Sequence, residues 1–166
     1  MNLLVIDSTA EDMVIAACND EKIAVRISKE GNKRHNSLIL PLIVEVLEEL
    51  QLDKKDLNAI GCVVGAGSFT GIRIGIATAQ ALSTALNIPT ISITAFEDMA
   101  YDELGNFITA IDCRHNNYYC AEFNGSWKNI VELKSYSKDE LSTKTIKVIY
   151  KESSTNGKNL IYILQY

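Results

Sequence analysis

The chain has 166 residues, of which 47% are hydrophobic and 22% are charged, a balance typical of a folded globular protein and not of a disordered one. Its formal net charge of -5 argues against a free-standing nucleic-acid binder, because polyanions are attracted to basic surfaces. The first apolar run meets Asp7 too early for a signal peptide, and no run reaches the ~20 apolar residues of a membrane span, so we expect a cytoplasmic protein without membrane contact.

The first hundred residues alternate apolar strand-like runs with two long helical patterns. We expect, in chain order, strands over 2–7, 13–18 and 22–28, a helix from Ser37 to Leu50, a strand over 59–64, a helix over 70–87, a strand over 90–93 and a short helix over 95–104. The short joints between the first three strands favour an antiparallel meander, because parallel neighbours need a longer crossover. Pro89 is expected to end the second long helix, and Gly105 the short one.

From about residue 100 the sequence becomes rich in strand patterns. Strands are expected over 107–112, 118–123, 127–136, 145–150 and 160–166. Asn124-Gly125, between the second and third of these, is typical of a type I′ hairpin turn. Together the patterns predict an α/β fold with a mixed sheet, in an N-terminal α/β lobe (1–100) and a smaller β-rich C-terminal lobe (101–166).

The segment VVGAGSFTGIRIG joins a strand to a helix through glycines, as phosphate-binding loops do. Its spacing does not fit them, because Gly65, Gly67 and Gly71 give GxGxxxG and no P-loop lysine follows. We therefore favour a tight strand-to-helix turn made by Gly65 and Gly67. The alternative is an anion at the positive end of the helix, with Asp7 and the two glycines around Mg-ATP; otherwise Asp7 caps its own turn.

No group of catalytic or metal-binding residues stands out. The two histidines, His35 and His115, fall in different lobes, and no CxxC, HxxxH or HExxH pattern occurs, so we expect neither a catalytic centre nor a metal site. Ser68 lies in GSFTG and not in a GxSxG nucleophile elbow, so a hydroxyl cap for the second helix, from Ser68 or Thr70, is the favoured role. The four cysteines are expected to be reduced and mostly buried.

Both long helices carry more apolar surface than one sheet can cover. The apolar residues of the first helix span roughly 240° of a helical wheel, whereas a helix on one sheet needs little more than about 100°. In the second helix, glycines and alanines would let another backbone approach closely. We expect a partner to cover these helices, the alternative being a further layer of the same chain. The expected interface residues are Leu38, Ile39, Leu42, Ile43, Val46, Leu50, Ile72, Arg73, Gly75, Ile76, Ala79, Gln80 and Ser83.

The order strand–turn–strand–strand, helix, strand, helix is the repeat of the actin, hexokinase and sugar-kinase superfamily, which has a ribonuclease-H-like fold. At IDSTAEDMVIAA, RHNSLILPLI, VVGAGSFTGIRIGIATAQALSTALNIPTISITAFEDMA and IDCRHNNYYCAEF, the chain closely resembles the TsaB (YeaZ) family. The resemblance covers residues 1 to about 123. It implies a non-catalytic partner of the TsaD transferase, which threonylcarbamoylates the adenosine beside the anticodon of tRNA.

The resemblance also implies how the chain assembles. Its two long helices would pack against the equivalent pair of a TsaD-like subunit, or of a second copy, as a helical bundle. A TsaE-like ATPase and tRNA would be met only through the complex. No cofactor would be intrinsic, and ATP or ADP would bind only at the partner or at the seam.

Some residues bear on the chemistry that the resemblance implies. Ala95 and Met99 stand where the metal-binding histidines of TsaD fall, which implies a degenerate site. The chain departs from the usual family pattern at Ala66, where Pro is common, and at Ser37, where Glu is common. The alternative function is a small ATP-binding phosphotransferase or ATPase of the same fold.

Overall fold

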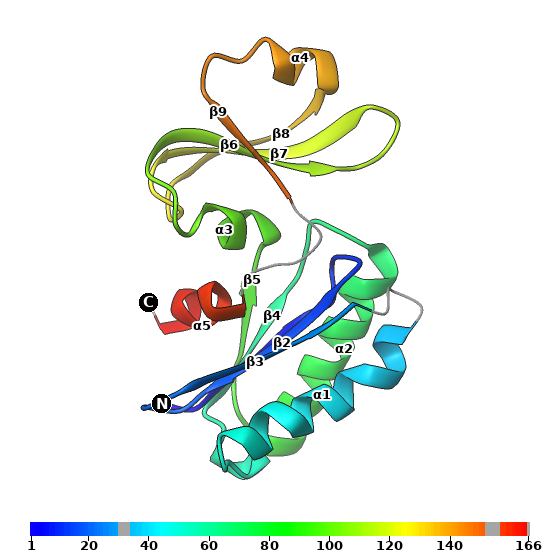
Figure 1. Ribbon diagram of the computed structural model, residues 1–166, viewed down its shortest axis with the longest axis vertical. Coiled ribbons are helices and arrows are strands. Elements are labelled where there is room, and N and C mark those ends of the chain that lie inside the picture. The colour runs from blue at the N-terminus through cyan, green and yellow to red at the C-terminus, as the bar shows by residue number, and fades with distance from the viewer. Residues whose placement is uncertain (30–33, 152–156, 166) are drawn as a thin grey trace.

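The computed structural model describes residues 1–29, 34–151 and 157–165, which form two lobes, each built on one sheet (Figure 1). The first sheet consists, in spatial order, of β3 (Ile23–Ser28), β2 (Met13–Cys18), β1 (Leu3–Asp7), β4 (Ala59–Val63) and β5 (Thr90–Ile93). β1, β2 and β3 pair antiparallel, whereas β4 and β5 run parallel to β1. The predicted meander and mixed sheet are confirmed, and the strand order is that of a ribonuclease-H-like fold.

Two long helices cover one face of this sheet, and a short one covers the other (Figure 1). α1 (His35–Glu49) and α2 (Phe69–Leu86) lie close to the predicted bounds. The side chains of β1 alternate between the two faces, as the two-residue period of a strand requires. Leu4 packs in the cluster beneath α1 and α2, whereas Leu3 packs in the cluster beneath the C-terminal helix.

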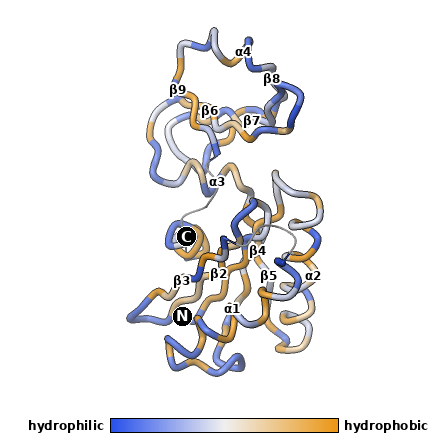
Figure 2. The backbone as a smooth tube through the Cα atoms, turned by 45° about the vertical axis from the view of Figure 1, so that its right-hand side comes forward, coloured by the Kyte–Doolittle hydropathy of each residue, from blue (hydrophilic) through white to orange (hydrophobic). Residues whose placement is uncertain are grey.

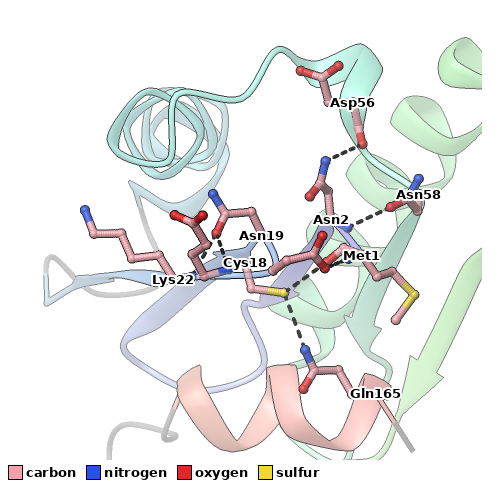
Figure 3. Close-up of polar contacts among 10 residues, drawn as sticks. Met1, Asn2, Cys18, Asn19, Lys22, Asp56, Asn58 and Gln165 are labelled. Atoms are coloured by element: carbon pink, nitrogen blue, oxygen red, sulfur yellow. Dashed lines mark hydrogen bonds and ion pairs between the residues drawn. The ribbon is translucent and has the colours of Figure 1, made fainter.

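That C-terminal element is α5 (Gly157–Gln165), where we expected a strand over 160–166. The prediction was wrong over 160–165, which are helical, and position 166 lies outside the described residues. Leu160 and Leu164, one helical turn apart, are both buried on the side of α5 that faces the sheet. α5 packs on the first sheet against β1, β2, β3 and β5, although it follows the second lobe in the sequence. Figure 3 shows its last residue, Gln165, whose Nε2 lies 3.9 Å from the sulfur of Cys18.

The second lobe holds a four-stranded sheet, and α3 (Ala95–Ala100) lies between it and the first lobe (Figure 1). Its strands, in spatial order, are β8 (Ile130–Ser137), β7 (Asn117–Gly125), β6 (Gly105–Asp112) and β9 (Lys147–Tyr150). β9 pairs parallel to β6, and the other neighbours are antiparallel. Figure 2, coloured by residue hydropathy, shows hydrophobic residues running through the strands of the first sheet.

Several local features differ from the sequence prediction. A type I′ turn needs left-handed φ at both central residues. Only Gly125 has it (87°), and the connection runs over residues 126–129, closed by a hydrogen bond from the Asn129 N–H to the Ser126 carbonyl. α3 ends at Ala100, short of the expected residue 104, and two short elements were not predicted: the 3-10 turn η2 (Lys54–Asp56) and α4 (Lys138–Ser142). The lobe boundary near residue 100 stays a prediction.

Within the described ranges, no helix is both long and apolar enough to cross a membrane.

Candidate functional site

The glycine loop between β4 and α2 is packed directly onto the β1–β2 turn. Gly65 has a left-handed φ of 126°, and a Cβ on Gly67 would lie 2.3 Å from the Thr9 carbonyl oxygen. The same carbonyl accepts the Ser68 N–H at 2.7 Å. The Ser68 side chain accepts the Gly71 N–H at 3.2 Å, so the predicted hydroxyl cap of α2 is confirmed at Ser68. The loop is therefore a tight turn whose glycines allow contact between two backbones.

Asp7 caps its own turn at the end of β1. Its carboxylate is fully buried and accepts hydrogen bonds from the Thr9 N–H at 2.8 Å and the Thr9 hydroxyl at 2.7 Å. This is the turn-capping role that the sequence left open. Of the three weak candidates for a nucleotide site, only Gly67 lines the hollow between the lobes, whereas Asp7 and Gly65 do not.

The hollow between the lobes has a volume of about 660 Å³ and a mixed lining. The first lobe contributes the β1–β2 turn and the start of α2, and the second lobe contributes the end of β6 and the residue after β9. Charged groups of both signs lie in it, with Glu11 and Asp112 opposed by Arg114 and Lys151.

A chain of polar groups crosses the floor of this hollow. Lys151 donates a hydrogen bond from Nζ to the Thr9 hydroxyl oxygen at 3.0 Å. The same hydroxyl donates to the Asp7 carboxylate. The positively charged ammonium of Lys151 therefore lies beside the turn that Asp7 caps. Sequence reasoning missed Lys151, because a single lysine after a short strand gives no local signal of a partner 142 positions away.

Asp98 on α3 is another buried acid, 6% exposed, and its charge interacts with those of Asp7 and Lys151. Within the described part of the chain its Oδ1 has no hydrogen-bond partner. Burial, the largest cause, and the negative charge of Asp7 together raise the pKa of Asp98 from 3.8 to about 7, although Lys151 opposes the shift. An acid in this state is costly to ionise.

The two positions at which the resemblance implies metal ligands in TsaD hold Ala95 and Met99, which do not fit a hard metal ion. Ala95 offers no donor atom and is fully buried, and Met99 packs its thioether against the core. His35 is buried, with its Nε2 3.0 Å from the Glu11 carbonyl oxygen, while His115 is exposed in the β6–β7 turn. Three of the cysteines, Cys18, Cys62 and Cys120, are buried as expected, and Cys113 is half-buried in the hollow.

The predicted helical interface needs a correction. Six of its thirteen residues face the chain's own sheet and are buried there: Ile39, Ile43, Val46, Leu50, Gly75 and Ala79. Gly71 and Gly75 admit the chain's own β1–β2 turn, since Cβ atoms there would lie 1.8 Å from the carbonyl oxygen and 2.6 Å from the hydroxyl oxygen of Ser8. The backbone that approaches these two glycines closely is therefore the chain's own β1–β2 turn, and not that of a partner.

The rest of the predicted set lies at the surface. Arg73 and Gln80 are exposed, and Leu38, Leu42, Ile72, Ile76 and Ser83 are half-buried. The predicted interface does not include three large apolar side chains of the two helices that are exposed, which are Leu40 (55% exposed), Val44 (51%) and Phe69 (67%). Exposed alanines, Ala77, Ala81 and Ala85, follow along α2. We call Leu40, Val44 and Phe69, with these three alanines, the helical face.

Comparison with known proteins gives one consistent family. The family model described as TsaD, tRNA N6-adenosine threonylcarbamoyltransferase, matches residues 27–158. The chain is 32% identical over 149 residues to the tRNA threonylcarbamoyladenosine biosynthesis protein TsaB of Buchnera aphidicola subsp. Acyrthosiphon pisum, with 87% of this chain and 66% of that protein covered. It is 32% identical to the TsaB of Escherichia coli K12, with 76% of this chain and 58% of that protein covered.

A solved structure shares the fold. "YeaZ from Pseudomonas aeruginosa" superposes with a TM-score of 0.84 over 99% of this chain and 90% of that chain, at 16% sequence identity. The alignments with the two curated relatives above span 66% and 58% of their lengths, less than two thirds of either protein.

Proposed function

The chain belongs to the tRNA N6-adenosine threonylcarbamoyltransferase (TsaD) family as a member of TsaB type, and from this premise we propose that it is a non-catalytic subunit of a tRNA threonylcarbamoylation complex. In this proposal it pairs through α1 and α2 with a TsaD-like transferase subunit, or through the same helices with a second copy. The transferase carries the chemistry on the adenosine, and this chain supports it.

The observation that carries the proposal is the helical face. α1 and α2 lie side by side on one face of the first sheet (Figure 1), and both bury their inner residues in one cluster beneath them. Leu40 and Val44 point away from that cluster and stay half-exposed, one helical turn apart. Large apolar side chains so placed, beside a stripe of alanines, are typical of helices that pack against other helices.

The hollow between the lobes supports the non-catalytic part of the proposal. An Mg-ATP site built around Asp7 would need a carboxylate that faces the ligand, but Asp7 is buried and accepts two hydrogen bonds from Thr9. The ammonium of Lys151 already lies beside that turn. We therefore propose that no nucleotide is bound by this chain alone, and that ATP or ADP belongs to the partner or to the seam between subunits.

Co-expression with a TsaD-like transferase, followed by gel filtration, tests the pairing. Leu40→Asp and Val44→Asp should each abolish co-elution, because a carboxylate would be buried without a partner in the bundle. Leu104→Asp is the matched control, since Leu104 is 83% exposed and lies after α3, away from α1 and α2. Co-elution of the Leu40→Asp and Val44→Asp chains at wild-type levels would overturn the proposal.

A second measurement tests whether the chain is a catalyst. The isolated chain, given tRNA and the threonylcarbamoyl donor, should leave the adenosine unmodified, and adding the transferase subunit should restore modification. Calorimetry with Mg-ATP on the isolated chain should give no heat of binding. Micromolar binding with turnover would favour the ATPase alternative instead.

A further inference from the structure

β8 is an edge strand of the second sheet with large apolar side chains in solvent. Among the strands that the structure describes, the order β8-β7-β6-β9 gives β8 a neighbour on one side only. Leu133 is 64% exposed and Val131 is 65% exposed, although both lie on a strand. An edge of this kind presents backbone groups and apolar side chains to any strand that can pair with it.

The pairing with β7 determines which backbone groups of β8 point outward. The Lys138 N–H donates to the Asn116 carbonyl just beyond the Asn117–Ser137 pair. Because hydrogen-bonded and non-hydrogen-bonded pairs alternate in an antiparallel ladder, Lys134 and Glu132 direct their backbone groups toward β7. Leu133 and Ser135 therefore direct their N–H and C=O groups away from the sheet, toward the open edge.

The charges around Leu133 are self-complementary. Glu132 precedes it and Lys134 follows it, and their side chains, each about half-exposed, form an ion pair at 3.3 Å within the strand. In an antiparallel pair of two identical strands centred on Leu133, residue 132 of one strand stands opposite residue 134 of the other. The Glu132 of each strand then lies opposite the Lys134 of the other, which gives two ion pairs. The two Leu133 residues lie opposite each other at the centre.

From these observations we propose that β8 pairs with β8 of a second copy of this chain, antiparallel and about a two-fold axis at Leu133. The pairing joins the two four-stranded sheets into one continuous sheet. In this register the outward backbone groups of Leu133 pair with those of Leu133 in the second copy, and Ser135 stands opposite Val131. The pairing also brings the Leu133 side chains together and exchanges Glu132–Lys134 ion pairs between copies. Because the interface is isologous, association stops at two chains and does not propagate.

Other registers fit less well. Centring the pair on Ser135 places Leu133 opposite Ser137 and removes the contact between leucines. Toward the other end, a register irregularity between Glu122 and Phe123 interrupts the β7–β8 ladder at Val131, which limits the regular part of the edge to a few residues. So short an interface lies below the ~1,200 Å² of stable complexes, and we expect association that depends on concentration.

The edge is separate from the helical face. β8 belongs to the second lobe, whereas α1 and α2 cover the first sheet at the other end of the molecule (Figure 1). One chain can therefore use both surfaces at once. The test is made in the Leu40→Asp/Val44→Asp background, which removes association through the helices, so that failure of this inference and failure of the proposed function give different results.

Sedimentation velocity over a range of concentrations measures the pairing. The background chain should form dimers at high concentration, and Glu132→Lys or Lys134→Glu should each weaken them at least tenfold, because like charges then stand opposite each other. The double reversal Glu132→Lys/Lys134→Glu should restore dimers. An equimolar mixture of the two single variants should form mixed dimers, since unlike charges then meet only between the two kinds of chain.

Three outcomes would overturn the inference: a background chain that stays monomeric throughout, single variants that associate as the background does, or a double reversal as weak as the singles. Circular dichroism of each variant provides the folding control, and both substituted side chains are about half-exposed. Raising the salt concentration should weaken the dimers of the background chain, because the exchanged ion pairs are exposed.

Discussion

Lys151, immediately after β9, donates a hydrogen bond from Nζ to the hydroxyl oxygen of Thr9, which lies in the β1–β2 turn, at 3.0 Å. The two residues belong to different lobes, and Thr9 in turn donates to the buried carboxylate of Asp7 at 2.7 Å. This relay closes the floor of the hollow between the lobes. It joins the two lobes through side chains.

Lys151→Met should therefore destabilise the fold. The substitution keeps the side-chain length and removes the ammonium, so we expect a loss of about 1.5–3 kcal/mol in the free energy of unfolding, the range for a hydrogen bond to a charged group. Lys147→Met, at the start of β9, is the matched control. Lys147 pairs with Glu103 at the surface, where an exposed ion pair contributes less than about 1 kcal/mol. Urea denaturation with equal losses for both variants would contradict the relay.

Asp98 should make stability depend on pH. Its pKa is about 7 in the folded chain and 3.8 as the ordinary value, so the folded state holds a proton that the unfolded state has released. The free energy of unfolding is therefore unaffected below pH 3.8 and falls as the pH rises. Above pH 7 the loss is complete and reaches as much as about 4 kcal/mol.

Asp98→Asn removes this titration, so the variant should exceed the wild type in stability at pH 8, and the difference should vanish near pH 4. Chemical denaturation across this range measures it. Glu48→Gln, which changes an exposed acid on α1, is the control and should show no such trend. A difference that does not change with pH would show that Asp98 titrates normally.

The elements that could be predicted from the sequence are those set by interactions between residues close in sequence. The bounds of α1, α2 and the first three strands follow from local signals, such as the Ser68 cap and the short joints of the meander. The run over 160–166 has too few polar residues to separate a strand from a helix by pattern. The helical form of α5 is favoured by its contacts with the first sheet, whose second face it covers, and these contacts are distant in sequence.

The site was harder to predict than the fold. A helical wheel identifies an apolar arc, but it does not tell which part of the arc faces the sheet. For this reason the wheel places Ile39 and Val46 in the predicted interface although they are core residues, and it does not single out the exposed Leu40 and Val44. The contact between Lys151 and Thr9 spans 142 positions, and neither residue has a neighbour in sequence that indicates it.

The glycines of α2 provide a prediction that separates two kinds of close contact. A Cβ on Gly75 would lie 2.6 Å from the hydroxyl oxygen of Ser8, whereas one on Gly71 would lie 1.8 Å from the Ser8 carbonyl oxygen. In an exposed helix either Gly→Ala change would stabilise by up to about 1 kcal/mol. Here both should destabilise, and Ser8→Ala should offset the loss at Gly75 but not at Gly71.

A double-mutant cycle measured by thermal unfolding tests this difference. Coupling between Ser8→Ala and Gly75→Ala should be favourable, because the first removes the atom that the second would meet. Ser8→Ala also loses the hydrogen bond from the Ser8 hydroxyl to the Gly71 carbonyl. The cycle subtracts this loss, because it is measured in the Ser8→Ala single variant. Equal coupling at Gly71 and Gly75 would mean that α2 shifts as a whole to relieve either contact.

The last prediction concerns α5, which covers the face of the first sheet opposite α1 and α2. Leu160 is fully buried in a cluster with Leu3 and Val5 of β1, so Leu160→Ala leaves a cavity and should cost about 2–5 kcal/mol. Ile163→Ala, at a half-buried position of the same helix, should cost less, because the site opens to water. Urea denaturation distinguishes the two, and equal small losses would show that α5 contributes little to holding the first lobe together.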